Sequence, residues 1–323
     1  MITIYSYDIA KGLLERPTPE ALPELLDRED VDLWVDLDEP TPGESEILRT
    51  VFNFHELAIE DCTEANIEEA KLDDYEDYLF LVTHPVSFKA DSLEFNIIEL
   101  DLFFGKNYVV TYHKKPTFGI NQLQKRLERS IEFMALGTDE ILHALIDSLV
   151  DNYVAMFKFI ERTIYRFEAE ILSNPTKKTF NDLYKLKIGL INLSRILIPE
   201  EEMMETLGET EHPLIQEENM VYFQDIHDHI STIKGLHQSY MQRTTTIIDT
   251  YMSLSTHRMN SVMQVLTVIA TIVLIPTLIA SIYGMNFDHM PFLHHPHGFF
   301  FISIVGLIIS GVMLWYFKTK DWF

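Results

Sequence analysis

The 323-residue sequence predicts an α/β domain followed by long helices and two C-terminal transmembrane helices. Three observations support this fold class. Short β-rich runs occur only before residue 113, strand signals vanish from about residue 138, and two uncharged apolar runs lie near the end. The formal net charge is -25, yet no Lys or Arg occurs between Arg258 and Lys318. We therefore expect an acidic cytosolic portion joined to a membrane-embedded tail.

The first 137 residues should form the cytosolic α/β domain. Strands are expected at residues 2–7, 33–37, 78–83, 95–104 and 107–112, because these runs are β-rich and are bounded by Gly, Pro, Asp and Asn. Helical patterns lie between them, for instance at residues 42–51 and 120–133. The alternation of the two patterns predicts a mixed α/β architecture.

The middle of the chain should be entirely helical. Residues 138–213 form a cytosolic helical segment, broken at 173–175 and again at 208–213 by Asn, Gly and Pro. Residues 214–261 begin a third helix, which meets no proline before Pro276. If it continues to residue 282, it is roughly 100 Å long at 1.5 Å per residue. A helix of that length cannot be buried in one monomer, so we expect it to pack against further copies of itself.

Residues 262–282 and 299–317 are 21 and 19 residues long and carry no charge, so each can cross about 30 Å of hydrocarbon as a helix. A buried hairpin of a soluble protein is the alternative, but buried helices seldom run so long without a charge. Basic residues flank the pair on its outer sides only. The positive-inside rule then places both termini, including the tail 318–323, in the cytoplasm and the loop 283–298 outside.

Composition excludes several classes of protein. A surface with 50 acidic and 25 basic residues would repel nucleic acid and favours cationic partners. The single cysteine, Cys62, excludes an internal disulfide and a thiolate zinc cluster, and we expect it to be a small helix residue rather than a reactive thiol. No nucleophile motif, phosphate-binding loop or zinc-protease spacing occurs, so the sequence predicts neither an enzyme nor an organic cofactor.

A small and polar seam follows the third helix into the membrane. Residues 253, 256, 260, 263, 267, 270, 274, 277 and 281 are spaced in threes and fours, as in a coiled coil, but most are Ser, Thr, Asn or Ala rather than Leu and Ile. Polar side chains are costly against lipid, so the seam should face a bundle interior or water. Close helix packing through small residues and a water-lined pore both explain it.

The loop after the first span begins with Gly284, Met285 and Asn286. The glycine should end the helix and let the chain turn, and Asn286 should place an amide at the external mouth; a simple helix cap is the alternative. The same loop contains Asp288, His289, His294, His295 and His297. This group is either an external site for Zn²⁺, Ni²⁺ or Co²⁺, which imidazole suits, or a polar loop that happens to contain histidine.

Residues 283–291, Tyr-Gly-Met-Asn-Phe-Asp-His-Met-Pro, resemble the signature of the CorA magnesium-channel family. The resemblance extends through the first span and to the order of acidic domain, long helices, two spans and short basic tail. It implies a homopentameric, funnel-shaped channel in the cell inner membrane that conducts Mg²⁺, and possibly Co²⁺ or Ni²⁺, inward down the electrochemical gradient. Gly284, Met285 and Asn286 would form its external mouth. The resemblance implies that Asp249, Asn260, Met263, Leu266, Ala270, Leu274 and Thr277 line the pore.

Two departures from the family pattern bear on these expectations. Leu274 stands where methionine is frequent, and Phe292-Leu293 replaces Glu-Leu, so external attraction of cations rests on Asp288. A zinc transporter similar to ZntB, which shares the Gly-Met-Asn turn, is the alternative function. A membrane-anchored metal sensor that does not conduct is a third, but it gives no reason for a polar seam through the bilayer.

The resemblance also assigns a regulatory site. Asp61 and Asp225 match the pair of carboxylates that holds a regulatory Mg²⁺ between neighbouring cytosolic domains, so internal Mg²⁺ would gate the channel. The alternative is an ordinary solvated acidic surface.

Overall fold

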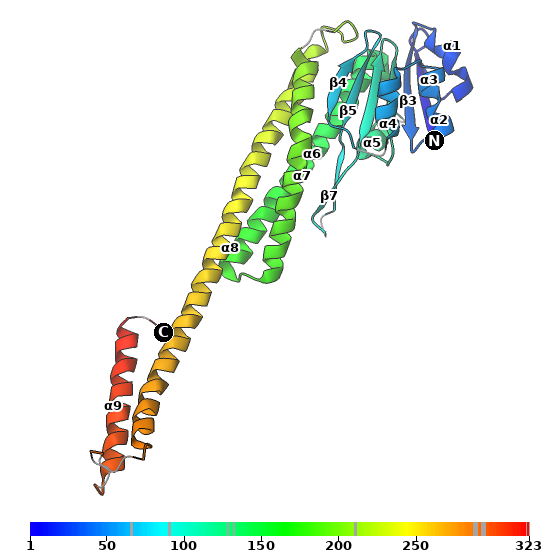
Figure 1. Cartoon of the computed structure of the whole chain (residues 1–323). Coiled ribbons are helices and arrows are strands. Elements are labelled where there is room, and N and C mark those ends of the chain that lie inside the picture. The colour runs from blue at the N-terminus through cyan, green and yellow to red at the C-terminus, as the bar shows by residue number, and fades with distance from the viewer. Residues whose placement is uncertain are drawn as a thin grey trace. The chain divides into compact units, whose positions relative to one another are not determined.

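The computed structural model describes residues 1–64, 67–89, 92–127, 129–131, 133–209, 212–286, 290–291, 295–320 and 322. The chain divides into two compact units (Figure 1). The first consists of Met1–Glu170 and Thr176–Ile247, and the second of Ile171–Pro175 and Ile248–Phe323.

A seven-stranded sheet organises the N-terminal part of the first unit, with the strand order β2-β1-β3-β9-β8-β5-β4. Its strands are β1 (Ile2–Asp8), β2 (Leu13–Glu15), β3 (Val31–Asp38), β4 (Lys71–Asp74), β5 (Tyr78–Thr83), β8 (Leu100–Gly105) and β9 (Tyr108–His113). Only β3 and β9 pair in parallel among these strands, and the other neighbours are antiparallel. Strands β6 (Val86–Lys89) and β7 (Glu94–Ile97) form a separate hairpin.

Both faces of the sheet are covered by helices. On one face, Val35, Phe103 and Val110 are buried beneath the short helices α1 (Leu22–Leu26), α3 (Ile47–Thr50) and α4 (Glu56–Thr63). On the other face lies α5 (Phe118–Leu127), whose Gln124 donates a hydrogen bond of 2.8 Å to Asp36. Helix α2 (Pro42–Ser45) and the 3₁₀ turns at Pro19–Ala21 and Met134–Leu136 also belong to this N-terminal part.

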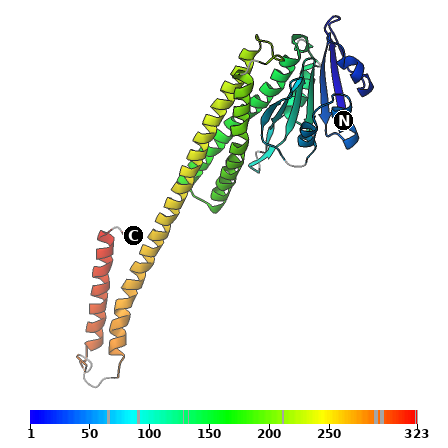
Figure 2. The ribbon, with the colours of Figure 1, turned by 45° about the horizontal axis from the view of Figure 1, so that its top comes forward.

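Three long helices follow and pack side by side in the first unit (Figures 1 and 2). They are α6 (Thr138–Ser173), α7 (Lys177–Glu209) and the first half of α8 (Met220–Tyr283). Arg243 of α8 pairs with Glu168 of α6 at 2.5 Å, and Lys234 of α8 pairs with Glu201 of α7. The His237 ring nitrogen lies 2.7 Å from the Leu190 carbonyl, so polar contacts as well as buried apolar residues fix α8 between its neighbours.

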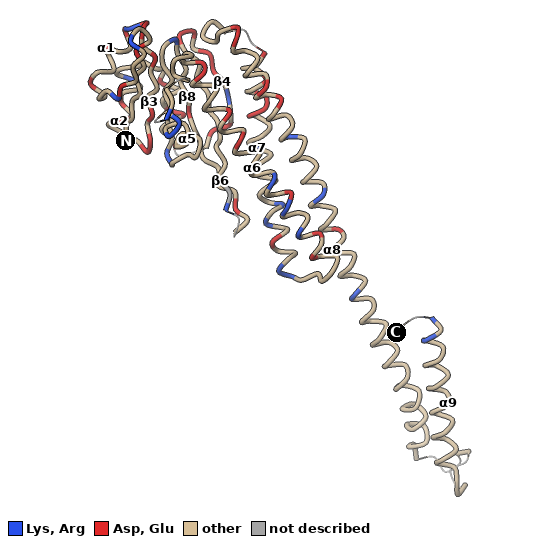
Figure 3. The backbone as a smooth tube through the Cα atoms, turned by 180° about the vertical axis from the view of Figure 1, so that it is seen from behind, with Lys and Arg blue, Asp and Glu red and all other residues tan. Residues whose placement is uncertain are grey.

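The second unit consists mainly of the C-terminal half of α8 and of α9 (Gly298–Thr319). Both helices are long and apolar enough to cross a membrane. Figure 3, which colours the backbone tube by residue type, shows almost no charged residues along them, in contrast to the first unit. The two helices contact each other around Val268 on α8 and Gly306 and Ser310 on α9, which are buried.

The predicted fold class is confirmed, with corrections to single elements. The expected strand at residues 95–104 is two strands in different sheets, because the chain turns between Ile97 and Leu100. The sequence analysis missed β2, β4 and β6, which are short and polar or lie near turn residues. Helix α8 begins at Met220 rather than at residue 214, since Asp139 holds Gln216 and Asn219 in turns by hydrogen bonds of 3.0 and 2.9 Å.

Candidate functional site

The predicted pore-lining residues share one side of α8. Asp249, Asn260, Met263, Leu266, Ala270, Leu274 and Thr277 are all exposed on the single chain. The residues turned towards α9 are Val268, Ile272, Ile275 and Ile279, which are buried or half-buried. Five of the predicted pore residues, those from Met263 to Thr277, lie within the span. At 3.6 residues per turn, their mean direction around the helix axis is about 170° from that of the four residues turned towards α9. The seam therefore lies on the side of α8 opposite to its contact with α9.

The hydroxyl groups near this seam are oriented by the helix itself. Thr277 donates to the Val273 carbonyl at 2.8 Å, Thr267 to Met263 at 2.8 Å and Thr271 to Thr267 at 2.7 Å. Each hydroxyl hydrogen is thus used within the helix, and the oxygen lone pairs remain outside it. Such oxygens accept hydrogen bonds, so they suit the hydrogens of water molecules bound to a cation.

Pro276 interrupts the backbone hydrogen bonds of α8 within the span, because proline has no N–H to donate to the Ile272 carbonyl. Ser310 of α9 replaces that donor, since its hydroxyl lies 3.4 Å from the Ile272 oxygen. A carbonyl without a partner is costly in hydrocarbon, and Ser or Thr side chains commonly compensate for proline there. This contact links the seam helix to α9 at mid-span.

The external motif comes directly after the end of α8. The Gly284 N–H still bonds to Ala280 at 2.9 Å, whereas that of Met285 bonds to Ile282 at 3.2 Å, which tightens the last turn. Gly284 ends the helix and begins a turn, as predicted, although it is not among the described glycines with positive φ. A Cβ there would lie 3.2 Å from the Ala280 oxygen, so crowding favours glycine. Asn286 is exposed just beyond this turn.

Only part of the histidine-rich loop is described. Asp288, His289 and His294 lie outside the described residues. His295 accepts a hydrogen bond of 3.3 Å from the backbone N–H of His297, the residue before α9. Within the described part of the chain, no three His, Cys, Asp or Glu side chains come together to hold a metal ion. The external metal site stays a prediction.

Asp61, the first predicted regulatory carboxylate, has a basic partner. The Lys71 ammonium lies 2.6 Å from Asp61 and 3.1 Å from Asp73. Burial lowers the pKa of Lys71, but the hydrogen bonds to Asp61 and Asp73 outweigh it and raise the pKa to about 12. The Asp61 side chain is 24% exposed. A divalent cation at Asp61 would have a carboxylate oxygen of the kind Mg²⁺ prefers, yet would compete with this lysine.

Asp225, the second predicted regulatory carboxylate, is open to solvent, with its side chain 69% exposed. It lies among titratable groups of α6 and α8, and the histidine His229 is 3.9 Å away. Burial raises the pKa of Asp147 on α6, and the charges of Asp151 and Asp225 raise it further. The sequence analysis missed Asp147. Its spacing of four from His143 and Asp151 was the available signal, because it places all three on one face of α6.

Cys62 is fully buried in α4, as expected for a structural residue. Burial raises the pKa of its thiol well above the usual range, and the neighbouring Asp101 raises it further. The thiol is therefore unreactive, since the thiolate is the nucleophile.

The sequence is similar to those of known metal ion transporters. A family model described as the CorA-like Mg²⁺ transporter protein matches residues 30–319. YfjQ of Bacillus subtilis, named as a candidate metal ion transporter, is 34% identical over 90% of this chain and 89% of its own length. The cobalt/magnesium transport protein CorA of Thermotoga maritima is 31% identical over 84% of this chain and 77% of its own length.

Solved structures share the fold. The complete CorA magnesium transporter of Methanocaldococcus jannaschii has a TM-score of 0.85 and 19% identity, and the match covers 100% of this chain and 99% of that one. The ZntB cytoplasmic domain of Vibrio parahaemolyticus has a TM-score of 0.61 and 14% identity, over 79% of this chain and 99% of that domain. At such identities the likeness concerns the fold alone.

Proposed function

The chain belongs to the CorA family of divalent cation transporters, and from this premise we propose that it conducts Mg²⁺ into the cell. Five copies surround one axial pore in the cell inner membrane, with both termini in the cytoplasm. Co²⁺ and Ni²⁺ pass as substitutes. The pore is lined by the exposed side of α8, with Asn286 at the external mouth and Asp249 at the cytoplasmic end.

One observation carries the proposal: the polar seam of α8 lies opposite to α9 and is exposed on the single chain. Polar groups inside a membrane are stable only against protein or water. A ring of copies with the seam inward satisfies this requirement. Close packing alone is less satisfactory, because Met263, Leu266 and Leu274 on the same side are large and keep helix axes apart.

The chemistry of the seam suits a hydrated ion. Mg²⁺ holds its water molecules tightly, so a conducting path contacts those waters instead of removing them. Asn286, Asn260 and Thr277 supply oxygen acceptors for them. Rings of Met263 and Leu266 close the path when it loses water. The membrane potential drives entry, at about 2.3 kcal/mol per elementary charge per 100 mV.

Gating follows from the two carboxylates. Asp61 of one copy and Asp225 of the next repel each other across the subunit interface, and a bound Mg²⁺ removes that repulsion. The ion therefore stabilises the closed arrangement while internal Mg²⁺ is high. When internal Mg²⁺ falls, the site empties and the pore opens. Lys71 weakens both the repulsion and the binding, because its ammonium, shared between Asp61 and Asp73, offsets part of the negative charge at Asp61.

Zinc transport is the second candidate function. The histidines of the external loop favour it, and the fold, which the chain shares with a ZntB domain, is compatible with it. Tyr283 before Gly284 and Met290-Pro291 after Asn286 favour magnesium, since these residues match the magnesium branch. Uptake by purified protein in liposomes, compared among Mg²⁺, Co²⁺, Ni²⁺ and Zn²⁺, separates the two. Preferred uptake of Zn²⁺ would overturn the magnesium assignment.

The proposal is tested directly by Asn286→Ala. This substitution should abolish Mg²⁺ uptake in liposomes, because the external mouth loses its amide oxygens. Gln264→Ala is the matched control: it also removes an amide from α8, but on the half-buried side near α9, and should leave uptake within about twofold. Both variants must assemble as wild type by mass measurement. Wild-type uptake by assembled Asn286→Ala contradicts the role of this residue.

A further inference from the structure

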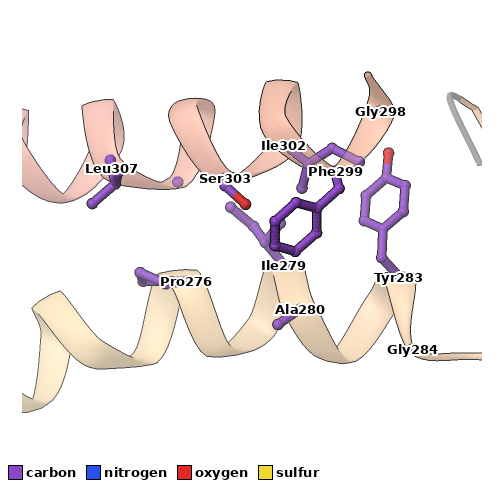
Figure 4. Close-up of a pocket in the computed structure, with 11 residues that line it drawn as sticks. Pro276, Ile279, Ala280, Tyr283, Gly284, Gly298, Phe299, Ile302, Ser303 and Leu307 are labelled. Carbon is purple, nitrogen blue, oxygen red and sulfur yellow. The ribbon is translucent and has the colours of Figure 1, made fainter. Parts of the chain in front are cut away.

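Two cavities of the described chain differ in the groups that line them. The larger, of about 600 Å³, lies between the external ends of α8 and α9, and apolar side chains such as Ile279 and Phe299 form most of its wall (Figure 4). Such a wall is compatible with lipid tails, which are as apolar as leucine. The smaller, of about 360 Å³, lies in the first unit and is lined in part by the buried carboxylate of Asp32. An apolar cavity needs no particular ligand, whereas a buried carboxylate needs a partner.

The smaller cavity lies where several segments of the first unit meet. Asp32 is the second residue of β3, Lys106 lies in the turn between β8 and β9, and Asp139 is the second residue of α6. The Thr138 hydroxyl donates a hydrogen bond of 3.2 Å to the Lys106 carbonyl, so the start of α6 is fixed against that turn. The connection between α7 and α8 supplies Gln216, whose backbone N–H bonds to Asp139 at 3.0 Å. The cavity is therefore built from elements that are tied to one another by hydrogen bonds.

The carboxylate of Asp32 lies in this cavity without a partner. The residue is 7% exposed, and no hydrogen bond or ion pair joins its side chain to any described residue. Burial, together with a smaller effect of the Asp139 charge, raises its pKa to about 6, so the group is mostly ionised at pH 7.5. Burial of an unpaired charge is costly, and a cation in the cavity removes this cost.

The other charged groups of the cavity already have partners. The two carboxylate oxygens of Asp139 accept hydrogen bonds from the backbone and side-chain N–H groups of Gln216, at 3.0 and 3.3 Å. The Lys106 ammonium lies 2.7 Å from Glu29 on the exposed surface. Among the described residues, no three His, Cys, Asp or Glu side chains are grouped as a metal ion requires. Asp32 thus offers one free carboxylate, which matches an ammonium ion, whereas Mg²⁺ demands an octahedral set of oxygens.

Apolar side chains complete the cavity on its open side. Ile9 and Leu136 line it and are 51% and 60% exposed. Methylene groups gain from contact with such side chains, whereas a hydrated inorganic ion does not. We infer that the cavity binds a primary aliphatic amine, whose ammonium pairs with Asp32 and whose methylene chain covers Ile9 and Leu136. This site uses no residue of the proposed pore and does not depend on the transport function.

Equilibrium dialysis of the full-length protein in detergent tests the site, with labelled 1,4-diaminobutane as the probe in Mg²⁺-free buffer at pH 7.5. One saturable site per chain is expected. Asp32→Asn should weaken binding about tenfold or more, because it removes the charge and keeps the shape of the side chain. Asp27→Asn, at an exposed position, is the matched control and should stay within about twofold of wild type. 1,4-Butanediol, which has the same chain length and no charge, should not displace the probe.

A pair of apolar substitutions tests the methylene contact. Leu136→Ala should weaken binding about threefold, since the amine loses apolar contact area. Leu13→Ala, at an exposed position of β2, should leave binding unchanged. Binding to Asp32→Asn that equals wild type would assign the amine to the general acidic surface and overturn the proposal. Displacement by equimolar Mg²⁺ would identify a site for divalent ions and overturn it as well. The absence of a saturable site in wild type would show that another group pairs with Asp32 in the assembled protein, with the same consequence.

Discussion

At the scale of single residues, the ion pair between Asp61 and Lys71 lowers the affinity that Asp61 would have for a divalent cation. Free carboxylates attract a divalent ion at full strength, but the ammonium 2.6 Å away competes for the same oxygen. This partner could not be predicted from the sequence, because it depends on the position of Lys71 in β4, a short polar strand without a strong strand signal. The identity of Asp61 could be predicted only by resemblance to the family.

Lys71→Met should therefore increase the sensitivity of the channel to internal Mg²⁺. Removal of the competing charge frees Asp61, and a gain of about 1.4 kcal/mol corresponds to a tenfold lower Mg²⁺ concentration for half-inhibition. Lys106→Met is the control, because Lys106 pairs with the exposed Glu29 and loses a charge of the same sign. Current is measured while internal Mg²⁺ is varied. An unchanged half-inhibition in Lys71→Met would show that Asp61 does not bind the regulatory ion.

The raised pKa of a second residue, Asp32, leads to a prediction of how the stability of the protein depends on pH. Burial, together with a smaller effect of the Asp139 charge, raises the pKa of Asp32 from 3.8 to about 6. Between these values the folded state keeps a proton that the unfolded state has lost, so stability falls as pH rises from about 4 to 6. Asp32→Asn should remove this loss, worth up to about 3 kcal/mol. Its melting temperature should exceed that of wild type at pH 7.5 and match it at pH 4.

The exposed Asp27 provides the control for this measurement. Asp27→Asn changes the net charge equally but should leave the difference between the two pH values as in wild type. Melting of the full-length protein in detergent is followed by intrinsic fluorescence. If Asp32→Asn melts at the same temperature as wild type at both pH values, ionisation of Asp32 does not lower the stability of the folded state, and the prediction is wrong.

At the scale of elements, the sequence predicted those helices and strands that are encoded by neighbouring residues. The apolar runs at residues 262–282 and 299–317 differ from the helix ends at Tyr283 and Gly298–Thr319 by no more than two residues, because length and absence of charge are local properties. The core strands β1, β3, β5 and β9 were predicted for the same reason. The pairing of Ser310 with the carbonyl freed by Pro276 was not, since it joins residues 38 apart.

This pairing predicts a non-additive effect of two substitutions. Ser310→Ala should destabilise the α8–α9 pair by about 1 kcal/mol, because the Ile272 carbonyl loses its donor. Pro276→Ala restores the backbone N–H, so Ser310→Ala should cost much less in that background. The measurement is a double-mutant cycle: the unfolding free energies of wild type, Ser310→Ala, Pro276→Ala and the double variant are compared in mixed micelles. Ser310→Thr keeps the hydroxyl and is the control. An equal cost of Ser310→Ala in both backgrounds would rule out the compensation.

At the scale of the whole molecule, the order of domains could be predicted, but the meeting of distant residues could not. Composition separates an acidic portion from an apolar tail, and the Gly-Met-Asn turn identifies the family. Asp147 and Asp225 lie 78 positions apart in sequence and approach only because α6 and α8 pack side by side. The proposed Asp61–Asp225 pair would join two copies of the chain, so a single chain cannot test it.

The subunit interface supplies the last prediction. Asp225→Lys places a fixed positive charge where the regulatory ion would bind, so it should keep the channel closed when internal Mg²⁺ is removed. Asp61→Ala with Asp225→Ala removes the repelling carboxylates and the ligands together, and should weaken inhibition by internal Mg²⁺. Glu205→Lys, at an exposed position of α7, is the charge-matched control and should respond as wild type. The measurement is current through membrane patches while internal Mg²⁺ is stepped from zero to millimolar. A wild-type current that ignores this step, or a double alanine variant inhibited like wild type, would exclude this pair as the sensor.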